Sequence, residues 1–498
     1  MASEYTPLVK LPAAPSTAKP LATRNRIIKA VIAAVAVLGL IALLVIPLSS
    51  DPATKVVAGN DNSSNPYLCG DTKNEAGYIK LANKRDGHYF YWFFQSKSAD
   101  PSKDPLVIWL TGGPGGSSMI ALMNENGPCS VQSDLSTKNN PYSWNNQANV
   151  IWLDQPISVG YSYGAPEDAD FNGTNVGENI YWFLQGFIEK HPEFDGREFF
   201  LTGESYGGHY VPSGAHYIWE QNKLGAKQPG SKRIDLQGIA IGNGWVNPII
   251  QNAHFIDMAD NSYNITLITD AQREQMAKDT KVCIQMTREC QQDPTNGTIC
   301  ADTLAFCYKT QTKVFAQSKR NPYDIREFCE SPTVGICNGM DYVRDFFNLE
   351  SVRKYLNVAD GPVKTWVEGS DEAGENLEGT SGDYMKNYEQ YVADLLDGGI
   401  RVLVYTGDAD AQCNWQGNEA WSSALEWSGK TSFNSVDQRS FIAHDPINSN
   451  ASPIDAGLVR SFGNFAVLRV FNAGHMVPAH QPAVSLDMID KFFKNQVL

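Results

Sequence analysis

Positive charge is in deficit in this chain of 498 residues, which has 40 Lys and Arg against 55 Asp and Glu and a formal net charge of −15. This deficit argues against the basic face that nucleic-acid-binding domains need, so we expect no nucleic-acid partner. It suits solubility in a neutral or acidic aqueous compartment. Internal repeats are also missing, and the length is sufficient for one large core with an insertion.

Charged residues are absent from positions 30–48, which form a continuous apolar run. At about 1.5 Å per residue, a helix of this length nearly spans the ~30 Å hydrocarbon core of a bilayer, so we predict a transmembrane anchor. The basic tail, residues 1–29, would stay cytoplasmic, and residues 49–66 would form a polar stalk. The remainder would be lumenal, as in a single-pass type II membrane protein. A cleaved signal peptide is the alternative, although the apolar run and the preceding tail are both long for one.

The cytoplasmic tail contains YTPL at residues 5–8, which matches the pattern of a tyrosine-based sorting signal. Such a signal would direct the protein to lysosomes or vacuoles, with the cell surface or the secretory pathway as alternatives. A four-residue match is common by chance, so this indication is weak.

Cysteine is missing from the first 68 residues, and six of the nine Cys lie between residues 283 and 337. No His lies among those six, which argues against a zinc site and favours disulfides formed in an oxidising lumen. Glycosylation sequons agree with this compartment, because all of them follow the apolar run. They are centred on Asn62, Asn172, Asn264, Asn296 and Asn450.

Short apolar runs alternate with helical patterns along the chain. The strand-like runs are PLVIWL, ANVIWL, EFFLTG, LQGIAIG, IRVLVYTG and AVLRVF, and helical patterns include residues 175–190 and 384–396. This alternation predicts an α/β fold whose central, mostly parallel sheet carries helices on both faces. An antiparallel hairpin is expected within residues 67–94. Residues 249–379 hold the Cys cluster and show no strong strand, so we interpret them as an insertion beyond the carboxyl ends of the strands.

The stretch EFFLTGESYGG places Ser205 between Gly203 and Gly207, directly after an apolar run. G-x-S-x-G between a strand and a helix is typical of a nucleophile elbow, where the backbone is strained and flanking side chains would collide. A glycine-rich turn with an ordinary serine gives the same letters, so the motif needs partners.

A base and an orienting acid follow Ser205 in the order of an α/β-hydrolase triad. Asp408 and Asp410 come after the run IRVLVYTG, and His475 comes after AVLRVF. Each of these would be unremarkable alone as a loop residue, but together with Ser205 they indicate nucleophilic catalysis. The oxyanion hole would use the backbone N–H groups of Tyr206 and Gly113, the latter in the glycine turn LTGGPGG.

Six ordered motifs between residue 67 and the C-terminus now indicate a family. WLTGGPGGSS, LDQPISVGYSY, GESYGGHYVP, IGNGWVNP, GDADAQCNWQGNEAW and FNAGHMVPAHQP resemble the serine carboxypeptidase family of the carboxypeptidase Y and cathepsin A type. The resemblance implies an α/β-hydrolase core, residues 67–248 and 380–498, with a disulfide-rich cap at 249–379. It implies release of C-terminal amino acids from peptides or proteins at acidic pH, without metal or cofactor. The oligomeric state stays open.

The resemblance also implies roles for individual residues. Asp410 rather than Asp408 would orient His475, and Cys413 would remain an unpaired cysteine beside the site. Glu125 and Glu204 would recognise the substrate's free carboxylate, because two adjacent carboxyls cannot both ionise cheaply and one would keep a proton to donate. Thr111 and Gly112 would join them. Matching positions for the substrate pocket are Trp109, Asn243, Cys413 and Met476.

Two departures from the family pattern bear on this assignment. Thr111 stands where the family has an asparagine that helps to bind the substrate carboxylate, as also happens in plant acyltransferases of the same family. Those acyltransferases tend to carry aspartate where this chain has Glu204, so hydrolysis is favoured, with acyl transfer as the alternative. Gly116 replaces a cysteine whose usual partner would fall in the 350–380 region, which contains no Cys. A scaffold role without catalysis is the remaining alternative, and the intact triad argues against it.

By the same resemblance we expect four disulfides. The pairs are Cys69–Cys129, Cys283–Cys307, Cys290–Cys300 and Cys329–Cys337.

Overall fold

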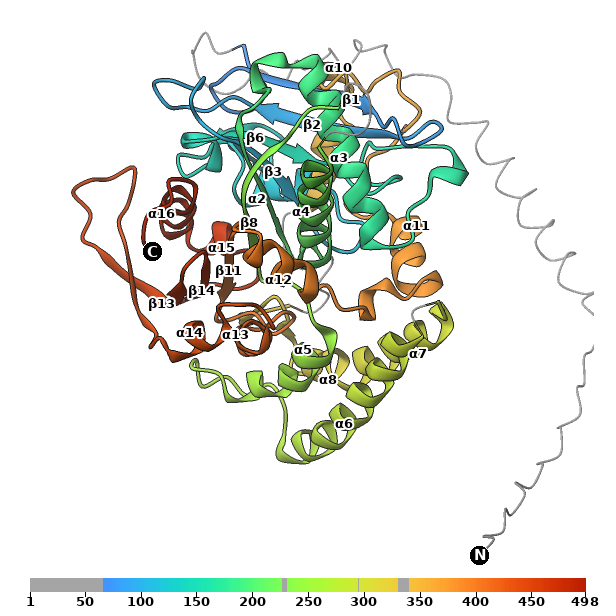
Figure 1. The fold of residues 1–498 in the computed structure, drawn as a ribbon, viewed down its shortest axis with the longest axis vertical. Coiled ribbons are helices and arrows are strands. Elements are labelled where there is room, and N and C mark those ends of the chain that lie inside the picture. Colours follow the sequence, from blue (N-terminus) through green and yellow to red (C-terminus); the bar gives the residue numbers. More distant parts are fainter. Residues whose placement is uncertain (1–65, 226–230, 294, 330–339) are drawn as a thin grey trace, which may run out of the picture. The chain divides into compact units, whose positions relative to one another are not determined.

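The computed structural model describes residues 66–225, 231–293, 295–329 and 340–498. Its centre is a ten-stranded sheet in the order β1-β2-β6-β3-β7-β8-β11-β14-β13-β12 (Figure 1). The six strands from β6 to β14 are parallel to one another, and the strands at both ends are antiparallel. In sheet order the strands are β1 (Asn74–Lys80), β2 (His88–Phe94), β6 (Asn149–Leu153), β3 (Leu106–Leu110), β7 (Glu198–Glu204), β8 (Asp235–Gly242), β11 (Arg401–Gly407), β14 (Phe465–Val470), β13 (Ile454–Phe462) and β12 (Arg439–Ala443).

The six strand-like runs predicted from the sequence form these six parallel strands, and the expected hairpin is β1–β2. All five residues of β3 are buried, and alternate side chains enter two different cores: Val107 and Trp109 in one, Ile108 and Leu110 in the other. A strand buried on both faces must be apolar throughout, which explains its continuous hydrophobic sequence.

Helices cover both faces of the sheet, as predicted. The helices on the face of Ile108 are α3 (Gly173–Lys190), α4 (Gly207–Leu224), α12 (Glu389–Asp397), α13 (Trp415–Ala424) and α14 (Lys430–Ser435). The helices on the face of Trp109 are α2 (Met119–Asn124), α9 (Met340–Asn348), α10 (Glu350–Tyr355), α15 (Val477–His480) and α16 (Pro482–Phe493). A short hairpin, β4 (Cys129–Val131) with β5 (Thr137–Asn139), follows α2.

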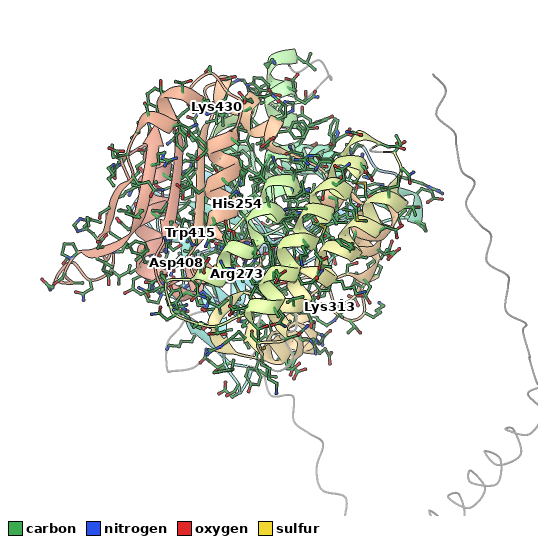
Figure 2. The ribbon with its side chains drawn as sticks, turned by 90° about the horizontal axis from the view of Figure 1, so that it is seen from below. His254, Arg273, Lys313, Asp408, Trp415 and Lys430 are labelled. Atoms are coloured by element: carbon green, nitrogen blue, oxygen red, sulfur yellow. A yellow bond between two sulfur atoms is a disulfide. The ribbon has the colours of Figure 1, made fainter. Side chains whose placement is uncertain are left out.

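The chain between β8 and β11 contains the predicted insertion. It comprises α5 (Pro248–His254), α6 (Asp270–Gln292), α7 (Gly297–Thr310), α8 (Thr312–Ala316), β9 (Arg320–Asn321), β10 (Asp324–Phe328), α9, α10 and α11 (Asp371–Gly374). No strong strand was expected in this region, and it contains two short ones, β9 and β10, which form an antiparallel pair. At the junction with the core, the Asn414 side chain donates to the His254 carbonyl (3.1 Å), and Figure 2 shows His254 and Trp415 near each other there.

Among the described residues, two disulfides lie within the insertion and one lies within the core. The structure forms Cys283–Cys307 and Cys290–Cys300 between α6 and α7, and Cys69–Cys129 before β1 and at β4. These are three of the four expected pairs. Cys329 is disulfide-bonded, and its expected partner, Cys337, lies outside the described residues.

The tail, the predicted span 30–48 and most of the stalk lie outside the described residues, as does Asn62. Among the helices that the structure does describe, none has the length and apolar character needed to cross a bilayer. Of the other sequons, Asn264 and Asn450 are exposed, while Asn172 and Asn296 are partly exposed and cap the N-termini of α3 and α7.

Candidate active site

Ser205 lies at the sharp turn between β7 and α4, with a backbone φ of 65°. A positive φ is unusual for a serine and is characteristic of strained functional turns. The neighbouring Gly203 is required by packing, because a Cβ there would lie 2.5 Å from the Leu110 carbonyl oxygen. The Ser205 side chain is therefore presented at the carboxyl ends of the parallel strands.

His475 and Asp410 meet beside this turn, although 65 positions separate them in sequence. They follow β14 and β11, which are adjacent in the sheet. The Nδ1 atom of His475 is 2.7 Å from Oδ2 of Asp410, and both side chains are buried. Because a carboxylate only accepts hydrogen bonds, Nδ1 carries the proton and Nε2 is left to accept one. Nε2 lies 3.9 Å from Oε1 of Glu204, the residue before Ser205.

Asp410 is held in place by three further donors. Its Oδ2 accepts from the side-chain amide of Asn243 (2.8 Å) and the backbone N–H of Cys413 (3.2 Å), and its Oδ1 accepts from the N–H of Gln412 (2.8 Å). Asn243, which was expected to line the substrate pocket, is fully buried behind the acid. Its role in holding Asp410 was not predicted from the sequence.

Asp408 faces a different set of groups. It accepts hydrogen bonds from the Tyr263 hydroxyl, the Asn472 backbone (2.9 Å) and the Arg469 guanidinium (3.3 Å). These hydrogen bonds hold the loop after β11 in place. The side chain that contacts His475 is that of Asp410, the residue for which the resemblance implied this role.

The glycine turn after β3 packs directly on the serine elbow. A Cβ at Gly112 would lie 2.4 Å from the Tyr206 backbone nitrogen and 2.8 Å from Cβ of Ser205. Gly113, next in the turn, has a φ of 117°. The Tyr206 side chain is fixed from behind, because its hydroxyl donates to the buried Asp383 carboxylate (2.6 Å). The two expected oxyanion donors therefore belong to adjoining backbone segments.

Glu125 and Glu204 form a buried, electrostatically coupled pair, and Glu204 lies next to His475. Burial raises the pKa of both carboxyl groups, and their mutual repulsion raises that of Glu204 further. Within the described part of the chain, Oε2 of each glutamate is buried without a hydrogen-bond partner. The pair therefore holds a proton at mildly acidic pH and has polar atoms available to a ligand.

Comparison with known proteins agrees with this geometry. A family model described as serine carboxypeptidase matches residues 66–495. The chain belongs to the serine carboxypeptidase family.

Individual relatives cover most of this serine carboxypeptidase. Serine carboxypeptidase-like 48 of Arabidopsis thaliana is 36% identical over 429 residues, covering 86% of this chain and 79% of that protein. The vacuolar serine-type carboxypeptidase ATG42 of Saccharomyces cerevisiae is 36% identical over 425 residues, covering 84% and 79%. The crystal structure of Kex1, a prohormone-processing carboxypeptidase from Saccharomyces cerevisiae, superposes with a TM-score of 0.74 at 26% identity, covering 85% and 92%. The enzyme is a serine-type carboxypeptidase with an α/β-hydrolase fold.

The remaining residues predicted for this carboxypeptidase site are Trp109, Thr111, Met476 and Cys413. The indole N–H of the buried Trp109 donates to Oγ1 of Thr111 (3.0 Å), so the Thr111 hydroxyl keeps its own proton for another acceptor. Met476, next to His475, is partly buried. Cys413 is a free, buried thiol whose pKa is raised by burial and by the nearby Asp410.

The inserted hairpin β9–β10 also supports the active-site loops, and the sequence analysis did not predict this. The carbonyl of Tyr323 accepts from the backbone N–H of His475 (2.7 Å), and the carbonyl of Pro322 accepts from Ala411 (2.9 Å). The hairpin thus contacts the loops of both the acid and the base. These contacts use backbone atoms, so no side-chain motif in the sequence could have indicated them.

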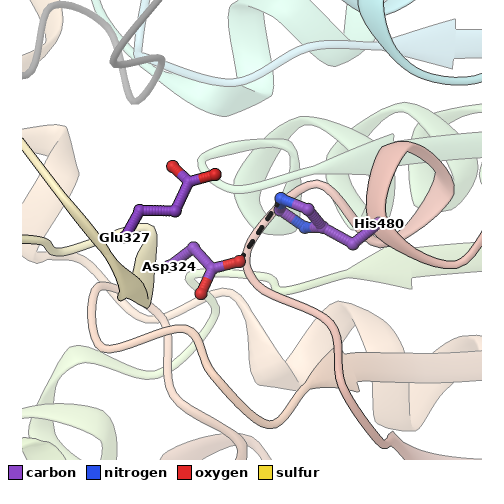
Figure 3. Close-up of side chains that lie close together, drawn as sticks. All are labelled: Asp324, Glu327 and His480. Atoms are coloured by element: carbon purple, nitrogen blue, oxygen red, sulfur yellow. Dashed lines mark ion pairs between the residues drawn. The ribbon is translucent and has the colours of Figure 1, made fainter.

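Asp324 and Glu327 of β10 form a cluster with His480 of α15 (Figure 3). Arg326 forms an ion pair with Asp324, so that carboxylate already has a cation. His480 accepts from the Gly474 N–H through Nδ1 (3.1 Å) and faces Asp324 through Nε2 (3.4 Å). We interpret the cluster as a polar support for the loop that carries His475.

Proposed function

We propose that Ser205, His475 and Asp410 are the catalytic triad of this carboxypeptidase and that Glu125 and Glu204 select substrates with a free C-terminus. The observation that carries the proposal is the buried carboxyl pair beside the triad, with Glu204 Oε1 3.9 Å from His475 Nε2. A peptide C-terminus bound at this pair would present its last peptide bond to Ser205.

In the proposed reaction, His475 Nε2 takes the proton of Ser205, and Oγ bonds to the carbonyl carbon of the last peptide bond. The N–H groups of Gly113 and Tyr206 stabilise the oxyanion. The C–N bond breaks, and the amino acid leaves with the proton from His475. Water then bonds to the acyl carbon and gives a proton to His475. The ester bond to Oγ breaks, the shortened peptide leaves as a carboxylic acid, and His475 returns the proton to Ser205. These steps use only side chains and backbone groups of the chain.

Carboxylate recognition would use three groups with different chemistry. The protonated member of the Glu125–Glu204 pair donates one hydrogen bond, and the N–H of Gly112 is the second donor. The Thr111 hydroxyl is the third, since its oxygen already accepts from Trp109 (3.0 Å). A threonine hydroxyl reaches less far than an asparagine amide, so the contact depends on the Trp109 indole that orients it.

The pH dependence of substrate choice tests this proposal. Below the raised pKa of the pair, a blocked dipeptide such as N-acyl-Phe-Leu should be cleaved about 10-fold or more faster than its C-terminal amide, which lacks the charged acceptor. As pH rises through that pKa the proton leaves, like charges repel the free acid, and the preference shrinks. We would measure kcat/KM for both substrates between about pH 4 and about pH 8, a range that brackets ordinary and raised carboxyl pKa values.

Glu204→Gln and Thr111→Val separate the contributions to this preference. The glutamine keeps a donor at all pH values, so the pH dependence of the preference should flatten. The valine removes the hydroxyl and should lower kcat/KM for the acid alone. Equal cleavage of acid and amide at every pH by the wild-type enzyme would contradict the carboxylate site, and acyl transfer to an added amine without hydrolysis would favour the acyltransferase alternative.

We also propose a type II anchor at residues 30–48 with a glycosylated catalytic part in a vacuole or lysosome. The apolar run, the basic tail and the sequons after the run support this proposal. The vacuolar location named for the ATG42 relative favours the organelle. Alkaline carbonate extraction of the full-length chain, with glycosidase digestion, is the test. Quantitative release of the protein into the carbonate supernatant would contradict the anchor.

A further inference from the structure

The glycine turn that contains Gly113 is paired with a distant segment, residues 366–370. The N–H of Ser117 donates to the Glu368 carbonyl (3.0 Å), and the N–H of Ser370 donates to the Gly115 carbonyl (3.0 Å). Gly116 and Gly369 therefore face each other as the non-hydrogen-bonded pair of a short antiparallel bridge. This pairing joins the region of Gly116, where the family's cysteine is missing, to the 350–380 region.

The turn needs such an external restraint. Gly112, Gly113, Gly115 and Gly116 have no side chains with which to pack, and glycine is the most flexible residue of the backbone. Within the turn, the Gly116 N–H donates to the Gly112 carbonyl (2.8 Å). An oxyanion donor has to stay at a fixed position to stabilise developing charge. Gly112 packs on the serine elbow, and the other end of the turn is held by residues 366–370, so both contacts bear on the position of the Gly113 N–H.

Helix α9 holds that segment through two side chains on one face. Arg344 forms a two-pronged ion pair with Glu368, with Nε 2.8 Å from Oε2. One turn later, Asn348 exchanges hydrogen bonds with the backbone of Trp366, accepting at 2.8 Å and donating at 2.9 Å. Positions i and i+4 share a helix face, so both contacts are made together.

The Arg344–Glu368 pair is buried at its carboxylate end and partly exposed at its guanidinium end. The Glu368 side chain is 11% exposed and the Arg344 side chain 37% exposed, and Arg344 lowers the pKa of Glu368. Arg344 also contacts Asp341, whose side chain is 83% exposed. A two-pronged pair whose carboxylate is buried restrains geometry better than a single contact between two exposed side chains. Glu368 is the residue whose carbonyl binds Ser117, so the ion pair acts one residue away from the bridge.

We propose that Arg344 and Glu368 are positioning residues for the oxyanion hole: they fix residues 366–370 and, through the Gly116–Gly369 bridge, the Gly113 N–H. The inference rests on the proposed role of Gly113 as an oxyanion donor. In this chain an ion pair from the inserted segment restrains the turn without a covalent bond.

Arg344→Gln tests the proposal in the full-length enzyme, with Lys354→Gln as the matched control. Lys354 forms an exposed i,i+4 pair with Glu350 on the next helix. We expect kcat of Arg344→Gln to fall about 10-fold or more, because small displacements of a catalytic donor are costly, while KM stays within about 2-fold. A peptide aldehyde, which forms a hemiacetal with Ser205, should lose affinity by the same factor, and the matching alcohol should not. Lys354→Gln should leave kcat, KM and both affinities unchanged.

A covalent replacement of the ion pair provides the rescue. A non-hydrogen-bonded pair has Cα atoms ~4.5 Å apart, which a disulfide can span. Gly116→Cys with Gly369→Cys in the Arg344→Gln background should restore kcat to within about 3-fold of wild type, whereas Gly116→Ser with Gly369→Ser should not. Mass spectrometry would verify the new bond.

The outcomes separate this proposal from the proposed function. A folded Arg344→Gln enzyme with unchanged kcat, or with only KM changed, would overturn the positioning role while leaving the triad intact. Equal loss of aldehyde and alcohol affinity would also overturn it, since the defect would then be general. Arg344→Lys keeps the charge but not the two-pronged contact, and we expect an intermediate kcat at an unchanged melting temperature. Failure of the proposed function itself would appear as wild-type activity that survives loss of Ser205.

Discussion

Replacing Ser205 with alanine is expected to lower kcat for peptide hydrolysis by about 10⁶-fold, the loss seen when a serine nucleophile is removed from a triad. Without the Ser205 hydroxyl, the site has no other nucleophile that could form the acyl-enzyme. The strained backbone at Ser205, with φ of 65°, places this side chain alone at the turn between β7 and α4. Release of the terminal residue from N-acyl-Phe-Leu, with labelling by a fluorophosphonate, measures the effect.

Substrate binding should survive the Ser205→Ala change. The proposed carboxylate site uses Glu125, Glu204 and Thr111, and none of them needs the serine hydroxyl. The dissociation constant of the variant for the dipeptide should therefore stay near that of the wild type. Ser213→Ala is the matched control, because Ser213 lies on α4 and its hydroxyl donates to the His209 carbonyl (2.7 Å), away from the reacting atoms. A Ser205→Ala enzyme that keeps more than trace activity would refute the triad.

The sheet was predictable from the sequence because each central strand is a short run of apolar residues. A strand buried on both faces is apolar at nearly every position, as in β3 and in β6 after Asn149, and glycines follow β3 where the chain turns. The hairpin β9–β10 was missed for the opposite reason. β9 has two residues and β10 has two exposed ones, so neither shows the apolar run of a core strand.

The site was predictable only where side chains carry the chemistry in recognisable order. Ser205, Asp410 and His475 follow β7, β11 and β14 in that order, and the order of the motifs revealed them. Glu125 came from the family resemblance, because a glutamate at the end of a short helix has no signal of its own. The pairing of Arg344 with Glu368 could not be predicted, since such a contact depends on how two segments pack rather than on local pattern.

Hydrogen bonds from neighbouring groups fix the orientation of the Asp410 carboxylate. Oδ2 accepts from His475, Asn243 and Cys413, so three donors converge on one oxygen. Oδ1 accepts from the Gln412 N–H (2.8 Å). Rotating the carboxylate would break several of these hydrogen bonds at once, which fixes the ring of His475 as well.

Asp410→Ala should therefore lower kcat by about 10⁴-fold, the scale of loss for a triad acid. The change removes both the orientation of His475 and the charge that stabilises its protonated form. Asp408→Asn is the matched control in the same loop. Its partners are Tyr263, Asn472 and Arg469, so it should reduce the melting temperature while changing kcat by only a few-fold. Steady-state kinetics with thermal unfolding would measure both.

Asp410→Asn distinguishes orientation from charge. Because Asn243 and Cys413 both donate to the Oδ2 position, the new amide should place its oxygen there and its NH₂ group toward Gln412. His475 would then keep its proton on Nδ1 and its accepting Nε2, and the variant would lose the charge together with the acceptor for the Gln412 N–H. Two unit charges ~4 Å apart interact by about 4 kcal/mol at an effective dielectric constant of ~20, which corresponds to about 10³-fold in kcat. A loss in Asp410→Asn as large as in Asp410→Ala would instead mean that the amide turns its NH₂ to His475 and traps the wrong tautomer, so that Asn243 and Cys413 do not control the orientation of the acid.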